Sequence, residues 1–501
     1  MEKKCVFITG ATGVMGRETL RAVLRRGDCR VRLLVRDSKK NRRLLKPYLG
    51  RDDVEVVWGD LLDAEAVSRA LGDARIVLHM GGLVSPMADR YPERTMKVNV
   101  GGTLNVVQTV KSRSYRDDIR LVYIGSVAQT SLRNPPVHWG RTGDPVISAQ
   151  FDHYGLSKIR AERVVAESGL KHWVSLRQTG ILHPGLFLRG SDPITFHVPL
   201  KGVLEWATLE DSGRLMAAMC GDDLPEELWR GFFNIGSGGD YRLTNYEFEC
   251  LILGAVGSPR PEKIFETDWF ATRNFHGCWF ADSDRLESLV PFREGIPAAE
   301  YFKQMVKKAP WWARLAPLAP APVVKGMMKK VALTPGYGTL DWLRRSDCED
   351  RINAFFGSRK ERENIPGWKD IDLSRPSETP SFLNHGYDES KSDTELGLAD
   401  FRQAAAFRGG RCLAPDPGDS DPTPEAKNDV DPNPEAKNDV DPNPEAKIGL
   451  DTPVEWECAF GHRFSATPRI VLKGGHWCPE CEGTASRHAE ALRNPFLSQI
   501  L

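Results

Sequence analysis

Several features that would place a protein in a membrane or on nucleic acid are absent from this sequence. No apolar run reaches the ~18 residues that a membrane-spanning helix needs, and we expect no signal peptide, because the chain runs straight into the apolar segment CVFITG. The 68 Lys and Arg residues balance the 68 Asp and Glu residues, so whole-protein attraction to nucleic acid is not indicated. Seven of the ten cysteines lack a paired spacing, a pattern typical of reduced thiols. We therefore expect a cytoplasmic protein.

The first third of the chain alternates apolar strands with helical stretches. Near-continuous apolar strands separated by helices are typical of a parallel sheet that is covered on both faces. The fold class predicted is α/β, a Rossmann-type doubly wound parallel sheet followed by a smaller substrate-binding part. The expected strands are CVFITG, CRVRLLVR, VEVVWGD, RIVLHM, RLVYIGS and HWVSLRQ.

Composition divides the 501 residues into several parts. Residues 1–375 are predicted to form the main domain, with the alternating strands and helices at about 1–177 and a less regular part at about 178–375. A flexible linker is expected over 376–450, since three tandem decapeptides at 421–450 offer almost no apolar side chain to bury. A small metal-binding module at 451–485 and a tail at 486–501 complete the prediction.

The stretch 301–340 contains no Asp or Glu, seven Lys or Arg residues and several large apolar side chains, among them Trp311, Trp312, Met327 and Met328. One interpretation is an interfacial segment or an apolar lid over the substrate, with peripheral membrane contact. The other, which we favour, is a pair of packed helices whose lysines extend to solvent.

The sequence TGATGVMG places glycines at Gly10, Gly13 and Gly16, between the first strand and the following helix. Gly10 permits a tight turn, Gly13 lets the backbone approach a pyrophosphate, and Gly16 lets helix and strand pack closely. Free N–H groups at the helix start would face the diphosphate. The predicted dinucleotide contacts in this loop are Gly10, Thr12, Gly13, Val14, Met15 and Gly16.

The end of the second strand bears on the choice of cofactor. An NAD-selective site has a carboxylate there for the ribose hydroxyls, whereas an arginine can pair with a 2′-phosphate. Arg36 is the first residue beyond the apolar run, so we favour NADP(H) over NAD(H). A shift of one residue would make Asp37 the ribose ligand instead.

Further motifs occur in the order and spacing of the extended short-chain dehydrogenases/reductases, and residues 4 to about 300 resemble that family. The motifs are GDL with Asp60 and Leu61; HMGGL with Met80, Gly81 and Gly82; VNVGGT with Asn99; YIGS with Ser126; and YGLSK with Tyr154 and Lys158. The resemblance implies cofactor contacts at Asp60, Leu61, Met80, Gly81, Gly82, Asn99, Tyr154 and Lys158. It also implies a homodimer formed through a helix pair that includes the YxxxK helix.

The resemblance makes Ser126, Tyr154 and Lys158 the catalytic residues. Residues four apart share a helix face, so Lys158 is expected beside the Tyr154 hydroxyl, where an ammonium would lower the phenol pKa. Ser126 would hydrogen-bond the substrate oxygen while Tyr154 exchanges a proton with it.

Two features separate the reactions of this family. Many of its sugar-nucleotide enzymes carry an asparagine three residues after the sixth-strand arginine, but Gly180 follows Arg177 at that distance. Together with Arg36, this favours reversible hydride transfer between NADP(H) and a secondary alcohol or ketone on a bulky, apolar, steroid-like small molecule. A nucleotide-sugar epimerase or dehydratase with tightly bound NAD is the alternative.

The carboxy-terminal module carries CxxxH followed by CxxC, with Cys458, His462, Cys478 and Cys481 as candidate ligands. Three thiolates and one imidazole suit tetrahedral zinc, and a set supplied wholly by protein indicates a structural ion. The module resembles the short zinc ribbons of pattern WxCxxGH…CPxC. Such a ribbon could dock protein or nucleic acid, so a dinucleotide-sensing regulator acting through it is a hypothesis of another class.

Overall fold

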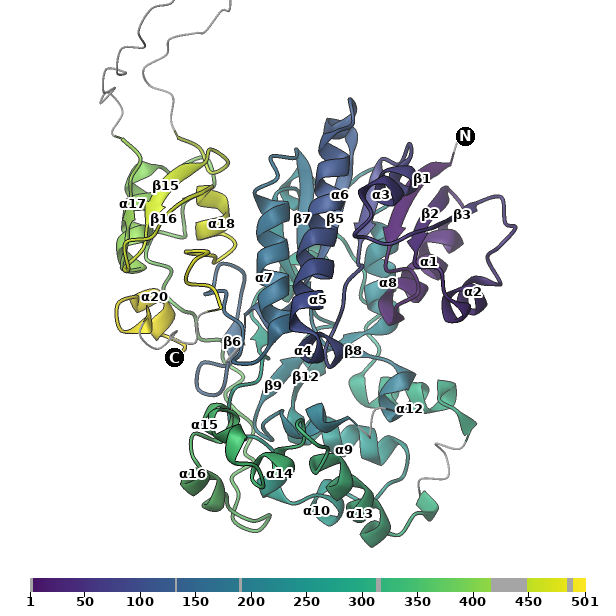
Figure 1. Ribbon diagram of the computed structural model, residues 1–501, viewed down its shortest axis with the longest axis vertical. Helices are drawn as coiled ribbons and strands as arrows, with labels where there is room; N and C mark the ends of the chain where they lie inside the picture. The colour runs from purple at the N-terminus through teal and green to yellow at the C-terminus, as the bar shows by residue number, and fades with distance from the viewer. Residues whose placement is uncertain (1–2, 131–132, 189–191, 312–316, 416–447, 484–489) are drawn as a thin grey trace, which may run out of the picture.

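A computed structural model describes residues 3–130, 133–188, 192–311, 317–415, 448–483 and 490–501 (Figure 1). Its centre is a seven-stranded sheet in the order β11-β7-β5-β4-β1-β2-β3, and every neighbouring pair is parallel. The strands are β1 (Lys4–Thr9), β2 (Cys29–Val35), β3 (Val54–Trp58), β4 (Ile76–His79), β5 (Arg120–Ser126), β7 (His172–Gln178) and β11 (Gly231–Ile235). The predicted doubly wound α/β fold is confirmed, and only β11 was not among the expected strands.

The strand order switches at β1: β2 and β3 lie on one side of it, and β4, β5, β7 and β11 lie on the other. Thr9, at the end of β1, is level with Leu34 on one side and with His79 on the other. The carboxyl ends of parallel strands meet at one edge, and ligands bind where the strand order switches. This register therefore brings the loops after β1, β4 and β5 together.

Helices cover both faces of the sheet. One face packs against α1 and α8 and the other against α3, α6 and α7, each face with its own buried core. The bounds are α1 (Val14–Arg26), α2 (Lys39–Leu45), α3 (Ala64–Leu71), α4 (Met87–Arg90), α5 (Pro92–Met96), α6 (Gly102–Lys111), α7 (His153–Ala166), α8 (Leu209–Ala218) and α11 (Ser283–Leu289).

A second region lies below the carboxyl end of the sheet in Figure 1. Three two-stranded sheets connect it to the core, and short helices surround them. Its elements are β6 (Trp139–Gly140), β8 (Ile181–Leu182), β9 (Val203–Glu205), β10 (Ala207–Thr208), β12 (Arg242–Thr244), β13 (Trp279–Phe280), α9 (Asn245–Ala255), α10 (Pro261–Ile264), α12 (Ala298–Lys308), α13 (Ala321–Ala332), α14 (Thr339–Trp342), α15 (Glu349–Phe356) and α16 (Arg359–Glu363).

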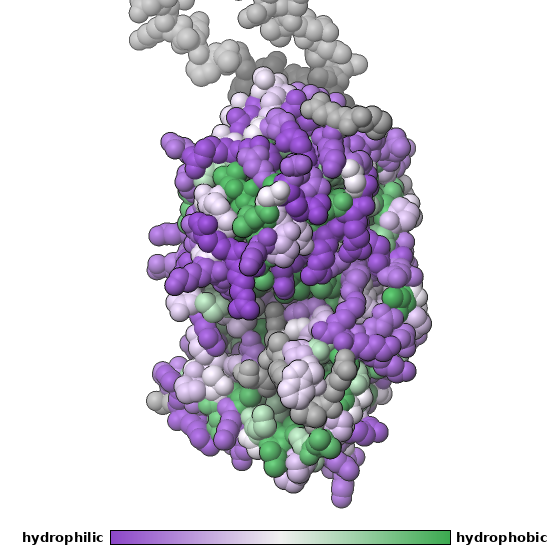
Figure 2. Space-filling model, turned by 90° about the vertical axis from the view of Figure 1, so that its right-hand side faces the viewer, coloured by the Kyte–Doolittle hydropathy of each residue, from purple (hydrophilic) through white to green (hydrophobic). Residues whose placement is uncertain are grey.

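The acid-free stretch contributes α12 and α13 to this region. Val324, Met328 and Val331 of α13 pack against a buried aromatic core, whereas Val323 and Met327 are exposed. On the side drawn in Figure 2, hydrophobic patches lie among hydrophilic side chains, one of them at the lower end, where Figure 1 places α13. No helix in the described part of the chain combines the length and apolar composition needed to cross a bilayer. Trp312 falls outside the described residues.

The carboxy-terminal part packs beside α7 (Figure 1). A three-stranded antiparallel sheet of β14, β15 and β16 forms its centre. Residues 398–412, which we expected within a flexible linker, form α17 and β14 instead, because β14 pairs with β15 and Phe401 and Ala404 are fully buried. The decapeptides fall mainly on 416–447, outside the described residues. The bounds are α17 (Leu398–Phe407), β14 (Arg411–Cys412), β15 (Val454–Glu457), β16 (Arg463–Ala466), α18 (Pro468–Leu472) and α20 (Pro495–Ser498).

Candidate active site and metal centre

The glycine loop joins β1 to α1 in a geometry that tolerates no side chain at two of its positions. Gly10 has φ +76°, and a Cβ there would lie 2.8 Å from the Gly81 nitrogen. A Cβ on Gly16 would lie 2.1 Å from the Gly10 carbonyl oxygen. Gly13 is exposed and begins α1 without a side-chain cap, so the helix starts with N–H groups available to an anion. Thr12 and Val14 are half-buried beside it, and Met15 is buried.

Arg36 and Asp37 follow β2 and are both exposed. Arg42 donates two hydrogen bonds to the Asp37 carboxylate, at 2.6 and 2.7 Å, and this bonding lowers the Asp37 pKa. In the described part of the chain no carboxylate pairs with the Arg36 guanidinium. Arg36 is thus the freer of the two candidates for a cofactor contact.

The loop after β4 is fixed to β1 by a buried chain of hydrogen bonds. The Gly81 N–H donates to Thr9 Oγ1 at 3.0 Å, and Thr9 Oγ1 lies 2.7 Å from His79 Nδ1. A Cβ on Gly81 would lie 2.7 Å from the Leu61 side chain and one on Gly82 would lie 2.9 Å from Asn99 Oδ1, so both loop glycines approach other segments closely. The other predicted cofactor contacts in these loops are half-buried at the same edge of the sheet. They are Asp60, Leu61 and Met80.

Asn99 connects this loop to the helix that carries Tyr154. Its amide accepts from the Leu83 N–H at 2.7 Å and donates to the Leu83 carbonyl at 2.9 Å and to Ser157 Oγ at 2.8 Å. Asn99 lies in a π-helical turn, Lys97–Gly101, a local distortion frequent at functional sites. In this arrangement both amide N–H groups bind protein, so Asn99 positions the loop and α7.

Ser126, Tyr154 and Lys158 meet at the end of β5. Tyr154 and Lys158 are one turn apart on α7, and the Tyr154 hydroxyl hydrogen-bonds Ser126. Lys158 is buried and donates from Nζ to the Ile124 carbonyl at 2.7 Å, with its ammonium over the Tyr123 ring. The structure thus assembles the three predicted residues at the carboxyl edge of the sheet.

The pKa values of the pair differ from our expectation. Burial raises the pKa of Tyr154 to about 12, because it outweighs the hydrogen bond from Ser126. Burial likewise lowers the pKa of Lys158 to about 8. Lys158 is bound to Ile124 and does not lower the Tyr154 pKa in this arrangement, so the neutral phenol is the dominant form at neutral pH.

Helix α7 begins beside His276, a histidine from a distant segment of the chain. Asp152 caps α7 by accepting from the Gly155 N–H at 2.7 Å, and its other oxygen lies 3.0 Å from His276 Nδ1. His276 also lines the large pocket described next. Its role thus includes holding the start of the Tyr154 helix.

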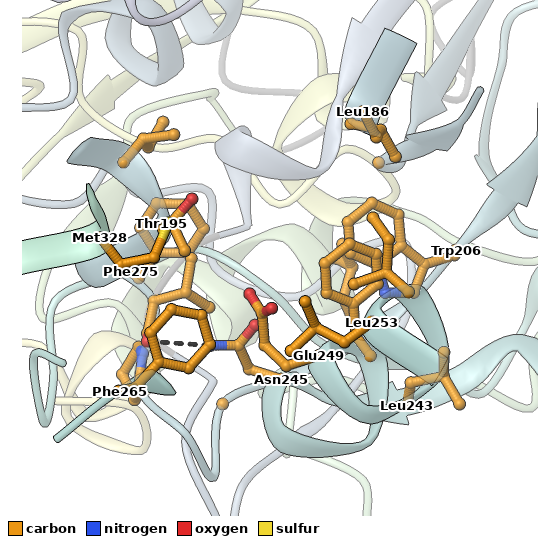
Figure 3. A pocket seen from close by; sticks show the side chains of 18 of the residues that line it. Leu186, Thr195, Trp206, Leu243, Asn245, Glu249, Leu253, Phe265, Phe275 and Met328 are labelled. Atoms are coloured by element: carbon orange, nitrogen blue, oxygen red, sulfur yellow. Dashed lines mark hydrogen bonds between the residues drawn. The ribbon is translucent and has the colours of Figure 1, made fainter. Parts of the chain in front are cut away.

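A pocket of about 840 Å³ opens below the sheet and extends to Val127, the neighbour of Ser126 (Figure 3). Most of its lining is apolar or aromatic. Trp206 stacks on Phe248 at 4.5 Å between ring centroids, and α13 supplies Met328 from another side. The side chains labelled in Figure 3 are Leu186, Thr195, Trp206, Leu243, Asn245, Glu249, Leu253, Phe265, Phe275 and Met328.

Sequence reasoning missed most of this pocket. Its residues come from segments between 127 and 331 that have no shared motif. The one available signal was the spacing of Asn245, Phe248, Glu249, Ile252 and Leu253, which places two polar residues in an otherwise apolar helix face.

The four predicted zinc ligands converge in the carboxy-terminal part. Their candidate ligand atoms all lie within 4.8 Å of one another. The Cys458 and Cys481 sulfurs are 3.9 Å apart, and His462 Nδ1 lies 3.4 to 3.6 Å from the sulfurs of Cys458, Cys478 and Cys481. A tetrahedral ion with Zn–S bonds of about 2.3 Å requires sulfur–sulfur edges of about 3.8 Å. The donor set and its spacing therefore fit zinc.

The second knuckle of this cluster, the loop that carries Cys478 and Cys481, packs directly on α7. Glu162, two turns after Tyr154, is fully buried and accepts from Arg177 at 2.7 Å, and its Oε1 lies 2.8 Å from His476 Nε2. Arg163 donates to the Trp477 carbonyl at 2.6 Å and to Glu482 at 2.9 Å. The metal-ligand loop and the helix that carries Tyr154 thus share one buried network.

Comparison with known proteins places this site in a family. Residues 6–180 match the model of the NAD dependent epimerase/dehydratase family. Over that region the chain is similar to this family, in agreement with its resemblance to the motifs of the extended short-chain dehydrogenases/reductases.

Individual relatives match part of the chain. The mouse 3 beta-hydroxysteroid dehydrogenase type 7 is 28% identical over 189 residues, 36% of this chain and 50% of its own length. The 3 beta-hydroxysteroid dehydrogenase/Delta 5-->4-isomerase of Mycobacterium tuberculosis is 27% identical over 184 residues, 35% of this chain and 46% of its own. The chain spans about half the length of the curated relatives it matches. The dTDP-glucose 4,6-dehydratase of Bacillus anthracis, solved with NAD, shares the fold with a TM-score of 0.50 at 14% identity, covering 62% of this chain and 98% of its own.

Proposed function

We propose that this protein is an NADP(H)-dependent oxidoreductase that transfers hydride between the nicotinamide and a secondary alcohol or ketone of a bulky apolar substrate. The observation that carries the proposal is the apolar pocket of about 840 Å³ that extends to the residue after Ser126. Such a lining suits a bulky, largely apolar molecule, and Ser126, which precedes Val127 in the chain, forms with Tyr154 and Lys158 a group that suits proton exchange with an alcohol or carbonyl oxygen.

The glycine loop fits the diphosphate because Gly10 and Gly16 leave the start of α1 open to close approach. Gly10, Gly13, Met15 and Gly16 would hold the diphosphate through backbone N–H groups. The bound nicotinamide supplies a hydride to a ketone or takes one from an alcohol.

The protein residues move the accompanying proton. During ketone reduction the Tyr154 hydroxyl donates its proton to the substrate oxygen as that oxygen gains negative charge. Ser126 donates a hydrogen bond to the same oxygen and polarises the carbonyl. The raised pKa of Tyr154 keeps its proton in place at neutral pH, which is the form that reduction requires. In the oxidative direction the same groups act in reverse.

The pocket lining also weighs against a nucleotide-sugar substrate. A Cβ on Gly180, where many sugar-nucleotide enzymes carry an asparagine, would lie 2.8 Å from the Trp206 ring and from Leu204. Among the described lining residues Lys330 is the only Lys or Arg, so this pocket offers few cationic partners to the phosphates of a nucleoside diphosphate. The steroid dehydrogenases among the relatives support an apolar substrate, whereas the NAD-containing dehydratase supports the alternative only through the shared fold.

We propose in addition that Cys458, His462, Cys478 and Cys481 bind one structural zinc ion. The four ligands all come from protein, so the ion has no open position for substrate. The buried contacts between the second knuckle and α7 support a structural role within the enzyme.

The test is fluorescence titration of the purified protein with NADPH and NADH, after its cofactor content has been measured. Arg36 in contact with the 2′-phosphate predicts preference for NADPH, and Arg36→Ala should reduce that preference roughly tenfold or more while NADH affinity stays the same. Lys40→Ala, also exposed after β2, is the matched control. Protein purified with tightly bound NAD, and Arg36→Ala without effect, would instead favour the epimerase or dehydratase hypothesis and Asp37 as the ribose ligand.

A further inference from the structure

A carboxyl group stands in the apolar pocket without a partner. Glu249 is only 6% exposed, and within the described part of the chain no residue donates a hydrogen bond to it or forms an ion pair with it. Figure 3 shows its carboxyl group directed into the pocket beside the side chain of Asn245. A buried polar group that lacks a partner costs free energy, so its place in a pocket wall points to a partner that arrives from outside the chain.

Glu249 belongs to the pocket face of α9. The residues of α9 and its end that line the pocket recur three or four positions apart: Asn245, Phe248, Glu249, Ile252, Leu253 and Val256. By contrast, Glu247 faces away and completes the capping box of the helix with Thr244. Glu249 therefore occupies a position where the helix pattern calls for an apolar side chain.

The surroundings of Glu249 favour the neutral acid. Desolvation raises its pKa to about 7, so a large share of the molecules carry a proton there at neutral pH. Two other ionisable residues line the same pocket, but Lys330 is exposed and His276 is bound to Asp152. A neutral carboxylic acid can donate one hydrogen bond and accept others.

Asn245 offers a second polar group at the same place. Its Nδ2 donates to the Val198 carbonyl at 3.1 Å, which leaves the amide oxygen facing Glu249 in Figure 3. Helix α9 lies in the region below the sheet, whereas Val127, at the reacting end, follows β5 directly. The two polar groups thus stand apart from Ser126 and Tyr154.

We propose that Glu249, assisted by Asn245, binds an uncharged oxygen at the end of the substrate remote from the reacting carbon. The ligand class is a rigid polycyclic molecule with a hydroxyl or carbonyl group at each end. Glu249 donates to or accepts from the distal oxygen and so fixes which end of the molecule faces Tyr154. The inference rests on the proposed function in taking this pocket as the substrate site.

Two steroid probes that differ only at the distal end test the assignment. Dihydrotestosterone is a four-ring ketone with a hydroxyl at the far end, and androstanone is the same ketone without that hydroxyl. Binding is measured without turnover, by quenching of tryptophan fluorescence, since Trp206 lines the pocket. We expect the protein to bind dihydrotestosterone about tenfold more tightly than androstanone, in keeping with one hydrogen bond in an apolar site.

Glu249→Leu should abolish this preference without weakening androstanone binding, and Glu249→Gln should retain most of it, because an amide still donates and accepts. The matched control is Glu363→Leu, an exposed glutamate of α16. Circular dichroism of each variant confirms the fold, and Glu249→Gln keeps the test valid if the leucine variant does not fold.

Equal binding of the two steroids by the unaltered protein, binding of neither, or a preference that survives in Glu249→Leu would each overturn the assignment. NADPH-dependent reduction of the same ketones is measured separately. A Glu249-dependent binding preference without any reduction would contradict the proposed function and leave the pocket assignment in place.

Discussion

Tyr154, Lys158 and Ser126 show how environment changes the chemistry of a motif. The YxxxK spacing places Tyr154 and Lys158 on one helix face, yet the Lys158 ammonium is bound to the Ile124 carbonyl at 2.7 Å. Burial then governs both groups, raising the pKa of Tyr154 to about 12 and lowering that of Lys158 to about 8. The motif thus places a neutral proton donor next to Ser126.

Replacing Tyr154 by phenylalanine removes that donor and little else. We expect turnover to fall at least about 100-fold, the usual contribution of a positioned general acid. NADPH binding, followed by fluorescence, should change little. Tyr91→Phe, at an exposed tyrosine, is the control and should retain full activity. Undiminished turnover in Tyr154→Phe would refute the assignment of the acid.

Glu249 gives a prediction about stability and pH. Its carboxyl ionises near its ordinary value of 4.5 in the unfolded chain and near 7 in the folded one. Between these values the unfolded state alone is ionised, so the folded protein loses stability as the pH rises, by about 3 kcal/mol once pH 7 is passed, at 1.36 kcal/mol per pKa unit. Glu249→Gln should therefore stabilise the protein at pH 8 and have little effect at pH 4.5.

Urea denaturation of both proteins at the two pH values measures the difference, with Glu363→Gln as the exposed control. A difference in unfolding free energy that is independent of pH would mean that the Glu249 pKa is the same in the folded and unfolded protein.

At the scale of elements, α7 is held from two directions. Asn99 ties its start to the loop after β4, and Glu162 and Arg163 tie its later turns to the segment that carries Cys478 and Cys481. Because Glu162 is fully buried with Arg177 and His476, removing one member of the network leaves an uncompensated buried group. The loop that carries Cys478 and Cys481 is therefore part of the support of the helix that carries Tyr154.

Loss of the metal should loosen α7. We expect about one zinc per chain, lost in Cys478→Ser, with faster amide hydrogen exchange in α7 and lower activity, because the second knuckle no longer keeps its shape. Metal analysis and hydrogen exchange measure the two effects. Cys250→Ser, outside the cluster, is the control. Retained zinc in Cys478→Ser would contradict the ligand set, and unchanged exchange in α7 would contradict the coupling.

At the scale of the whole molecule, one of the buried cores is shared by two parts that the sequence suggested were separate. Trp456, Ile470 and Trp477 of the carboxy-terminal part lie in the same core as Trp173 and Val165 of the sheet domain. The protein's own carboxy-terminal part packs against α7, the helix through which the family resemblance implied a homodimer. This packing explains why the metal-binding module, which we expected on a flexible linker, is held against the sheet domain.

This arrangement predicts a monomer. With α7 covered, the helix pair expected to form the dimer is not free to pair with a second copy. Light scattering at micromolar concentration should give the mass of one chain, 56.0 kDa. A mass about twice as large would mean that another surface forms a dimer or that the carboxy-terminal part leaves α7 in solution.

The sequence alone determined the features that depend on local chemistry. Alternating apolar strands and helices, the glycine turn, the YxxxK spacing and the paired metal knuckles act over a few residues, so their patterns predicted six of the seven strands of the central sheet and the residues gathered at its edge. The tertiary structure decided what depends on distant contacts. The pocket joins segments from Val127 to Val331, and all of them together leave Glu249 without a partner among the described residues. Strand β14 forms only because β15 pairs with it. Burial and desolvation come from residues far apart in the chain, and no short pattern records them.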